Sequence, residues 1–197
     1  MQIYWTCASV IGDTDIPERL PIPSRHLEPN GADNMISMQM DTEERAPLYF
    51  EDIAVGACFT GGARRVTAEE IKSFAREYDP QPFHTDEAAA KDTFFEGLAA
   101  SGWHTAAITM RLLADYGPPV AGGLIGGAAE ISWPQPTRPG DVLHVVAEIV
   151  DVKPSRSRPE RGMVVMRSET KNQRGEVVQI LTAKLVVPRR NPGTAVA

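Results

Sequence analysis

The chain has 197 residues and a formal net charge of −6. This length fits one domain with an added arm, and an acidic balance without a basic stripe argues against nucleic acid as the main partner. Two cysteines outside any zinc-ligand pattern argue against a disulfide framework and a structural metal site. No apolar run is long enough for a membrane span and no secretory signal is visible, so we expect a cytoplasmic protein.

Residues 1–46 contain several prolines and no sustained hydrophobic period. We therefore predict an extended or disordered N-terminal arm, with packing of the arm on the domain surface as the alternative. The folded domain is expected at 47–190, followed by a C-terminal tail at 191–197.

The domain is predicted to begin with a strand at 57–66 and an amphipathic helix. Thr67 and Glu70 form a capping box ahead of that helix, and Pro80 prevents it from continuing. Its apolar residues follow the spacing of one helical face, and they are Ile71, Phe74, Ala75 and Tyr78.

A short helix is expected at 87–91 and a longer one at 102–116, followed by a glycine-rich loop at 121–127. The longer helix has a wide apolar stripe, formed by Trp103, Ala106, Ala107, Met110, Leu113 and Ala114. The rest of the chain is predicted to form four strands, at 128–134, 142–152, 162–170 and 177–187. Long antiparallel strands after one central helix predict an α+β fold in which a curved sheet wraps around that helix.

The segment Asp-Pro-Gln-Pro-Phe-His at 79–84 carries the most specific chemistry of the chain. Pro80 and Pro82 stiffen this loop, because each proline fixes its own φ and biases the preceding residue away from helix. Asp79 and His84 are therefore able to share one water, with one group taking its proton and the other donating one. The alternative is an Asp-Pro turn that leaves a helix beside a surface histidine.

Two segments together resemble the MaoC-like dehydratase family, which includes the R-specific enoyl-CoA hydratases. The hydratase motif of that family runs Asp-x-Asn-Pro-x-His, and this chain matches it except that Gln81 replaces the asparagine. Downstream, the family often has His-Gly-Met at the start of its central helix. Here Gly102 matches the glycine, between Ser101 and Trp103.

The resemblance covers roughly residues 49–187 and implies a hotdog fold, usually assembled as a homodimer. It implies that Asp79 and His84 are catalytic and that the chain is a carbon–oxygen lyase of fatty acid metabolism, which adds water reversibly to a 2-enoyl-CoA. The CoA thioester is then the substrate, and we expect no cofactor or metal. The alternatives are a hotdog acyl-CoA thioesterase and a non-catalytic acyl-CoA-binding subunit.

The two helix ends near this motif have complementary chemistry. Asp79 lies at a helix C-terminus, where the dipole and burial would both raise the pKa of its carboxyl toward a range useful for a general base. The N–H of Gly102 has no partner inside its helix, and a residue without a side chain allows a carbonyl to approach closely. A thioester oxygen bound there gains negative charge as water adds to the β-carbon.

Ser101, Trp103 and Phe83 are further candidates for substrate binding, although aromatic residues beside a core helix are more often part of the core. We expect His104 to pack or cap rather than line the pocket. Asp86 is expected to cap the short helix rather than orient the catalytic histidine.

Three arginines lie within six residues of each other in the loop between two predicted strands. They are Arg156, Arg158 and Arg161. Guanidinium groups bind phosphate in a bidentate way, so the cluster is a candidate site for the phosphates of CoA. The alternative is a solvated hairpin.

Overall fold

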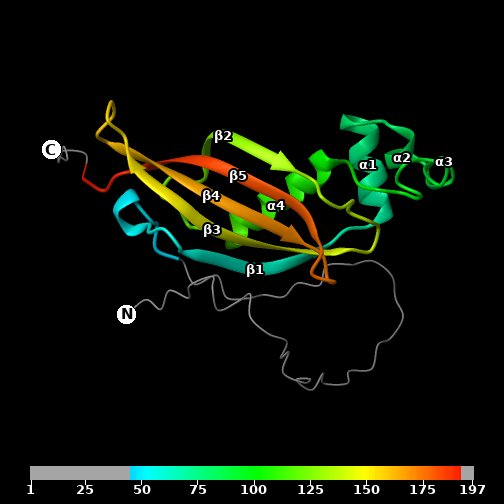
Figure 1. Cartoon of the computed structure of the whole chain (residues 1–197), viewed down its shortest axis with the longest axis horizontal. Helices are drawn as coiled ribbons and strands as arrows, with labels where there is room; N and C mark the ends of the chain where they lie inside the picture. The colour runs from blue at the N-terminus through cyan, green and yellow to red at the C-terminus, as the bar shows by residue number, and fades with distance from the viewer. Residues whose placement is uncertain (1–44, 192–197) are drawn as a thin grey trace, which may run out of the picture.

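The computed structural model describes residues 45–191, which form one antiparallel sheet with a long helix across one of its faces (Figure 1). Nearly all of the predicted N-terminal arm, and residues 192–197 of the predicted tail, lie outside the described residues. The helices are η2 (Phe50–Asp52), α1 (Ala68–Tyr78), α2 (Pro82–Thr85), α3 (Glu87–Ala90) and α4 (Gly102–Tyr116). The strands are β1 (Cys58–Arg65), β2 (Ile125–Ser132), β3 (Val142–Pro154), β4 (Arg161–Lys171) and β5 (Val177–Pro188).

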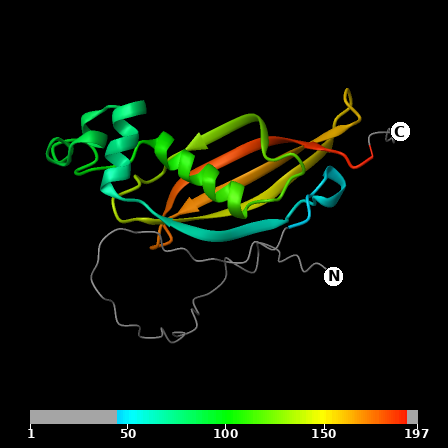
Figure 2. The same ribbon diagram turned by 180° about the vertical axis from the view of Figure 1, so that it is seen from behind.

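The strands are ordered β1-β3-β4-β5-β2, and every neighbouring pair is antiparallel. Strands β1 and β2 are therefore the two edges. Figure 2 shows α4 lying across the sheet, with α1, α2 and α3 gathered at one end. This is the hotdog fold that the resemblance implied, and the predicted strands and the long helix are confirmed within a few residues.

The glycines in β1 make room for the C-terminal end of α4. Gly62 has a φ of 59°, and a Cβ there would lie 2.0 Å from the ring of Tyr116. The register of β1 against β3 shifts at this point, between Gly61 and Arg64. A larger residue would require both a strained backbone and a displaced tyrosine.

The buried face of α4 differs from the apolar stripe seen in the sequence. The side chains that α4 buries are those of His104, Thr105, Ile108, Thr109, Leu112 and Leu113. Of the predicted stripe, Leu113 is buried as expected, whereas Trp103 and Met110 are exposed. Buried polar groups need hydrogen-bond partners, and the two buried threonines of α4 find them in other threonine hydroxyls. Thr105 bonds to Thr137 at 3.0 Å, and Thr109 to Thr170 at 2.7 Å.

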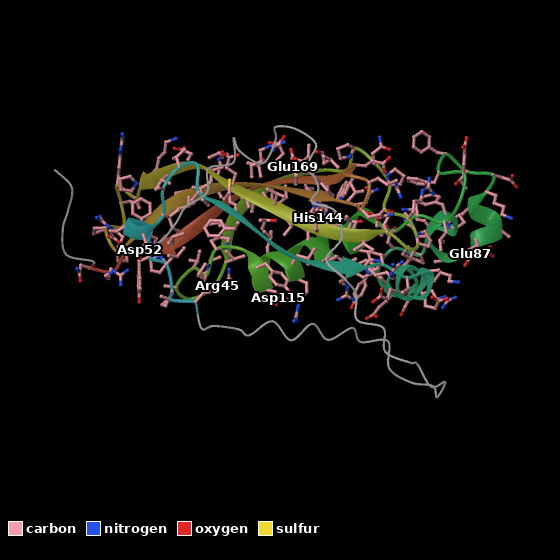
Figure 3. The ribbon with its side chains drawn as sticks, turned by 90° about the horizontal axis from the view of Figure 1, so that it is seen from below. Arg45, Asp52, Glu87, Asp115, His144 and Glu169 are labelled. Atoms are coloured by element: carbon pink, nitrogen blue, oxygen red, sulfur yellow. The ribbon has the colours of Figure 1, made fainter. Side chains whose placement is uncertain are left out.

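Residues just before the domain fasten the other end of α4. Arg45 donates hydrogen bonds to the backbone carbonyls of Asp115 and Gly117, and Figure 3 shows Arg45 beside Asp115. These are orphan carbonyls at a helix C-terminus, where a cation is favourable. Leu48 then pairs with Val120 through a backbone bridge.

Among residues 45–191, no helix is both long and apolar enough to cross a membrane.

Candidate functional site

The end of α1 positions the first candidate residue. Thr67 and Glu70 form the predicted capping box at the start of this helix, with the Thr67 hydroxyl accepting from the Glu70 N–H. Asp79 is the C-cap, and its N–H donates to the carbonyl of Ala75. Pro80 ends the helix as expected.

The short helix α2 positions the second candidate residue. Pro82 occupies its first turn, where the missing N–H breaks no helical hydrogen bond, and His84 is the third residue of the helix. The distance from His84 Nε2 to Asp79 Oδ2 is 3.5 Å. His84 is buried and Asp79 is only one-fifth exposed at its side chain. The structure thus brings together the two groups of the predicted dyad, rather than leaving the histidine on the surface.

A buried carbonyl fixes the tautomer of His84. The Nδ1 atom lies 2.8 Å from the backbone oxygen of Ala99, which only accepts hydrogen bonds, so Nδ1 carries the proton. In the neutral ring, Nε2 is then an acceptor that faces the Asp79 carboxylate. Two acceptors 3.5 Å apart are able to receive the two O–H groups of one water.

Both oxygens of Asp79 accept hydrogen bonds from side chains. Ser101 Oγ donates to Oδ2 at 2.7 Å, and Gln81 Nε2 donates to Oδ1 at 2.8 Å. Burial alone raises the pKa of the Asp79 carboxyl, but the hydrogen bonds donated by Ser101 and Gln81 favour the ionised form, and the pKa lies below its ordinary value. The expectation of a raised pKa was wrong, because it counted burial and the helix dipole without these donors.

Ser101 connects the dyad to the start of α4. It is fully buried, and its Oγ also accepts from the backbone N–H of Trp103, which makes it the N-cap of α4. One hydroxyl therefore caps the helix and fixes the carboxylate. The N–H of Gly102 makes no hydrogen bond to any of residues 45–191 and is available to an oxygen of a ligand.

The space next to Gly102 is occupied by an aromatic ring that the sequence did not reveal. A Cβ on Gly102 would lie 2.7 Å from the indole of Trp133. Glycine at this position is thus required by the close approach of Trp133, whereas the sequence suggested only the approach of a substrate carbonyl.

The other candidates fall into two groups. Phe83 packs edge-on against His84, with ring centroids 4.5 Å apart, while Trp103 is exposed beside Trp133. His104 stacks on Phe74 between α4 and α1, which confirms that it packs in the interior. The side chain of Asp86 caps α3 by accepting from two backbone N–H groups, as expected.

Arg138 holds the segment that supplies the acceptor for His84. Its guanidinium donates to the backbone carbonyls of Phe95, Gly97 and Leu98, just before Ala99. The sequence placed this arginine in a turn at 138–141, similar to the strand-entry turn of the MaoC-like family, and gave it no role in the site. The neighbouring Pro139 and Gly140 mark the turn in the sequence. The segment that Arg138 binds is 40 residues away, and the contact is visible only in the structure.

The domain has two hollows that bear on substrate binding. An apolar cavity of about 340 Å³ lies between α4 and β2, and Met110, Leu113, Leu124 and Leu181 contribute to its lining. A more open cleft of about 610 Å³ has charged residues in its lining, among them Glu87 and Lys91. Neither hollow is lined by Asp79 or His84. Only the first offers an apolar environment along the helix that starts at Gly102.

The arginine cluster lies at the other end of the sheet. The hairpin between β3 and β4 is far from α2 (Figure 1). Strand β3 begins next to the end of β1 that leads into α1, and its 13 residues extend about 40 Å toward the hairpin. Arg156 and Arg158 are exposed, and Arg161 pairs with Glu160 at 2.9 Å. Within one chain, the structure does not bring this cluster to the dyad.

Comparison with known proteins gives a consistent result. Residues 49–172 match the family described as MaoC like domain. The crystal structure of the MaoC-like dehydratase from Rhodospirillum rubrum is 60% identical with a TM-score of 0.71, over 73% of this chain and 99% of that one. The uncharacterized protein YdeM of Bacillus subtilis is 31% identical over 130 residues, which is 64% of this chain and 89% of YdeM. The 3-hydroxybutyryl-CoA dehydratase of Methylorubrum extorquens is 29% identical over 112 residues, which is 56% of this chain and 69% of that protein.

Proposed function

The chain belongs to the MaoC-like dehydratase family, and on that basis we propose that it adds water reversibly to a 2-enoyl-CoA. The single observation that carries this proposal is the arrangement of Asp79, His84 and Ser101. Two acceptors, one of them an ionised carboxylate with a low pKa, face each other beside a free N–H at a helix N-terminus. A water bound to one side of the pair is within reach of both bases.

In the proposed reaction, water donates one O–H to Asp79 and the other to His84. Its oxygen forms a bond to C3 of the enoyl group as Asp79 takes a proton. The electron pair of the C2–C3 double bond moves toward the thioester oxygen, and the Gly102 N–H donates to that oxygen. The same pair of side chains then returns a proton to C2. The product is a 3-hydroxyacyl thioester, and no atom or electron is left over.

The substrate needs no cofactor in this scheme. The conjugated thioester activates its own β-carbon, and we expect the acyl chain to enter the apolar cavity along α4, near Met110 and Leu113. Apolar lining with few polar groups suits a hydrocarbon tail. Phe83 and Trp103 are the proposed aromatic borders of the reacting end.

We further propose that the functional unit is a homodimer. The edge strand β2 is exposed along almost all of its length, and Glu130 is its only charged residue. Such an edge favours pairing with another strand, and the exposed Trp103 and Met110 of α4 lie on the helix that would be covered with it. Sedimentation at micromolar concentration tests this; a monomer there contradicts it.

One assay with two readouts tests the reaction. Crotonyl-CoA is incubated with the full chain while the enoyl absorbance and free thiol are followed in parallel. Loss of absorbance without thiol supports the hydratase. Release of thiol identifies a thioesterase instead, and binding with neither change identifies a non-catalytic acyl-CoA-binding protein.

A further inference from the structure

Trp133 lies against the N-terminus of α4, where the proposed thioester oxygen binds. It follows β2 directly, and a Cβ on Gly102 would lie 2.7, 2.9 and 3.0 Å from its Cε2, Cδ2 and Cζ2 atoms. Cε2 is a ring-fusion atom without a free edge, so the contact is made through the face of the indole. The ring therefore lies flat against the α-carbon of Gly102.

A buried glutamine fixes the rotation of this ring. Trp133 Nε1 donates to Oε1 of Gln179 on β5 at 2.9 Å. Gln179 is fully buried, yet its Nε2 has no hydrogen-bond partner among residues 45–191. An unpaired buried donor lowers stability. Gln179 is therefore better explained by what its oxygen does, which is to hold the indole in one orientation.

A second ring also limits the movement of Trp133. Trp103 packs edge-on against it, with ring centroids 5.6 Å apart and an interplanar angle of 76°. Trp133 thus contacts Gly102, Gln179 and Trp103, although its indole remains partly exposed. A ring held in this way is a rigid surface rather than a loose side chain.

The position of the indole matters for any ligand of Gly102. In an α-helix both the Cα–Cβ direction and the first N–H groups point toward the N-terminus. An oxygen that accepts from the Gly102 N–H therefore lies next to the indole that occupies the Cβ direction. The carbonyl carbon is about 1.2 Å from that oxygen. Its two substituents, the sulfur and C2, are then brought close to the ring.

We propose that Trp133, held in place by Gln179, is a specificity-determining residue that excludes acyl thioesters branched at C2. A methyl group on C2 would need the space that the indole fills, whereas an unbranched C2 would not. Gln179 is a positioning residue, because it acts on the substrate only through Trp133. This inference rests on the proposed function, since it takes the thioester oxygen to bind at Gly102.

The test compares two pairs of ligands. Turnover is measured with crotonyl-CoA and 2-methylcrotonyl-CoA, and binding is measured by calorimetry with the unreactive butyryl-CoA and 2-methylbutyryl-CoA. We expect the wild type to prefer the unbranched member by at least about tenfold in both measurements, the scale of one misfitting methyl group. Trp133→Leu should reduce that preference by at least about fivefold.

Two further variants separate the ring from its support. Trp133→Phe keeps an aromatic face without the N–H donor, and Gln179→Met keeps length and burial without the acceptor. Both should reduce the preference in the same direction as Trp133→Leu. Thr170→Val is the matched control, because Thr170 is buried opposite Gln179 on β4 and bonds to Thr109 instead. It should leave the preference unchanged.

The outcomes are distinct. A wild type without preference, or variants that all keep the wild-type preference, would overturn the role of Trp133 while leaving hydration of crotonyl-CoA intact. A change of equal size in Thr170→Val would show a general loosening under α4 and would also overturn it. If the wild type binds none of the four CoA thioesters, both this inference and the proposed function fail.

Discussion

The two ends of the sheet each present a group of charged or titratable residues that the sequence singled out, but only one end builds a site. Next to α2, the carboxylate of Asp79 accepts two hydrogen bonds and the ring of His84 is fixed by a buried carbonyl. At the β3–β4 hairpin, Arg156 and Arg158 are exposed. Spacing along the chain makes both groups candidates for a functional site. Burial and hydrogen bonding distinguish the positioned pair from the solvated cluster.

The sharpest way to break this comparison is to remove the dyad. Asp79→Asn and His84→Ala should each lower kcat by at least about 100-fold, the usual scale for losing a general acid–base group. Turnover of crotonyl-CoA measures the effect, and circular dichroism verifies folding. Asp86→Asn is the control, because this carboxylate is close in sequence but only caps α3. Near-wild-type turnover in either dyad variant rules out the mechanism.

Ser101 tests whether the dyad depends on its support. Ser101→Ala removes the donor to Asp79 Oδ2, and a hydrogen bond to a charged group is worth about 1.5–3 kcal/mol, so kcat should fall by roughly tenfold or more. Loss of the α4 N-cap should also lower the free energy of unfolding by about 1 kcal/mol. Asp86→Ala removes a different N-cap without touching the dyad. If both variants lose equal activity, Ser101 acts only on the fold.

Much of the fold could be predicted from local chemistry. The capping box at Thr67 and the block at Pro80 gave the limits of α1, and α4 begins and ends where expected. The buried face of α4 could not be predicted, because its threonines are compatible with the core only through hydroxyl partners on distant segments, such as Thr170. Of the apolar stripe, Leu113 is buried in the core, but Trp103 and Met110 are exposed.

The candidate site divides in the same way. The pairing of Asp79 with His84 follows from six adjacent residues, so the sequence contains it. The lowered pKa of Asp79 depends on Ser101, which is 22 residues away. The aromatic ring packed against Gly102 comes from Trp133. These long-range partners carry no local pattern, and only the folded chain reveals them.

Gln81 sharpens the comparison through pH. Gln81→Met keeps the length of the side chain but loses the donor to Asp79 Oδ1, so the pKa of Asp79 should rise. Because Asp79 acts as a base only when ionised, the acidic limb of the pH profile of kcat/KM should move to higher pH. Gln81→Asn serves as the comparison that retains a carboxamide. Superimposable acidic limbs for wild type and Gln81→Met would contradict this assignment.

His104 tests the packing behind the dyad. Burial lowers its pKa, while the charges of Glu70 and Arg64 act in opposite directions and change that result little. The unfolded chain then binds a proton at higher pH than the folded one, so stability is present above about pH 6.5 and is lost as pH falls through the folded pKa. His104→Phe keeps the stack on Phe74, and its melting temperature should fall less between pH 7.5 and 5.5 than that of the wild type. Equal falls would show that His104 does not contribute.

The smallest effect is expected at the arginine hairpin. Arg156 and Arg158 are at the far end of the sheet from the dyad of their own chain, so they reach a bound CoA only at the site of a second copy. The contact would be the same in the ground and transition states, so Arg156→Ala with Arg158→Ala should raise KM for CoA thioesters and leave kcat nearly unchanged. Exposed charge contacts contribute little, which limits the rise to a few-fold.

Added salt should raise the wild-type KM in the same way, because such contacts are screened. A pantetheine thioester without the nucleotide is the control substrate, and its turnover should be unaffected. If the double variant keeps the wild-type KM for crotonyl-CoA at low salt, the hairpin is only solvated, and the functional site lies entirely at the end of the sheet next to α2.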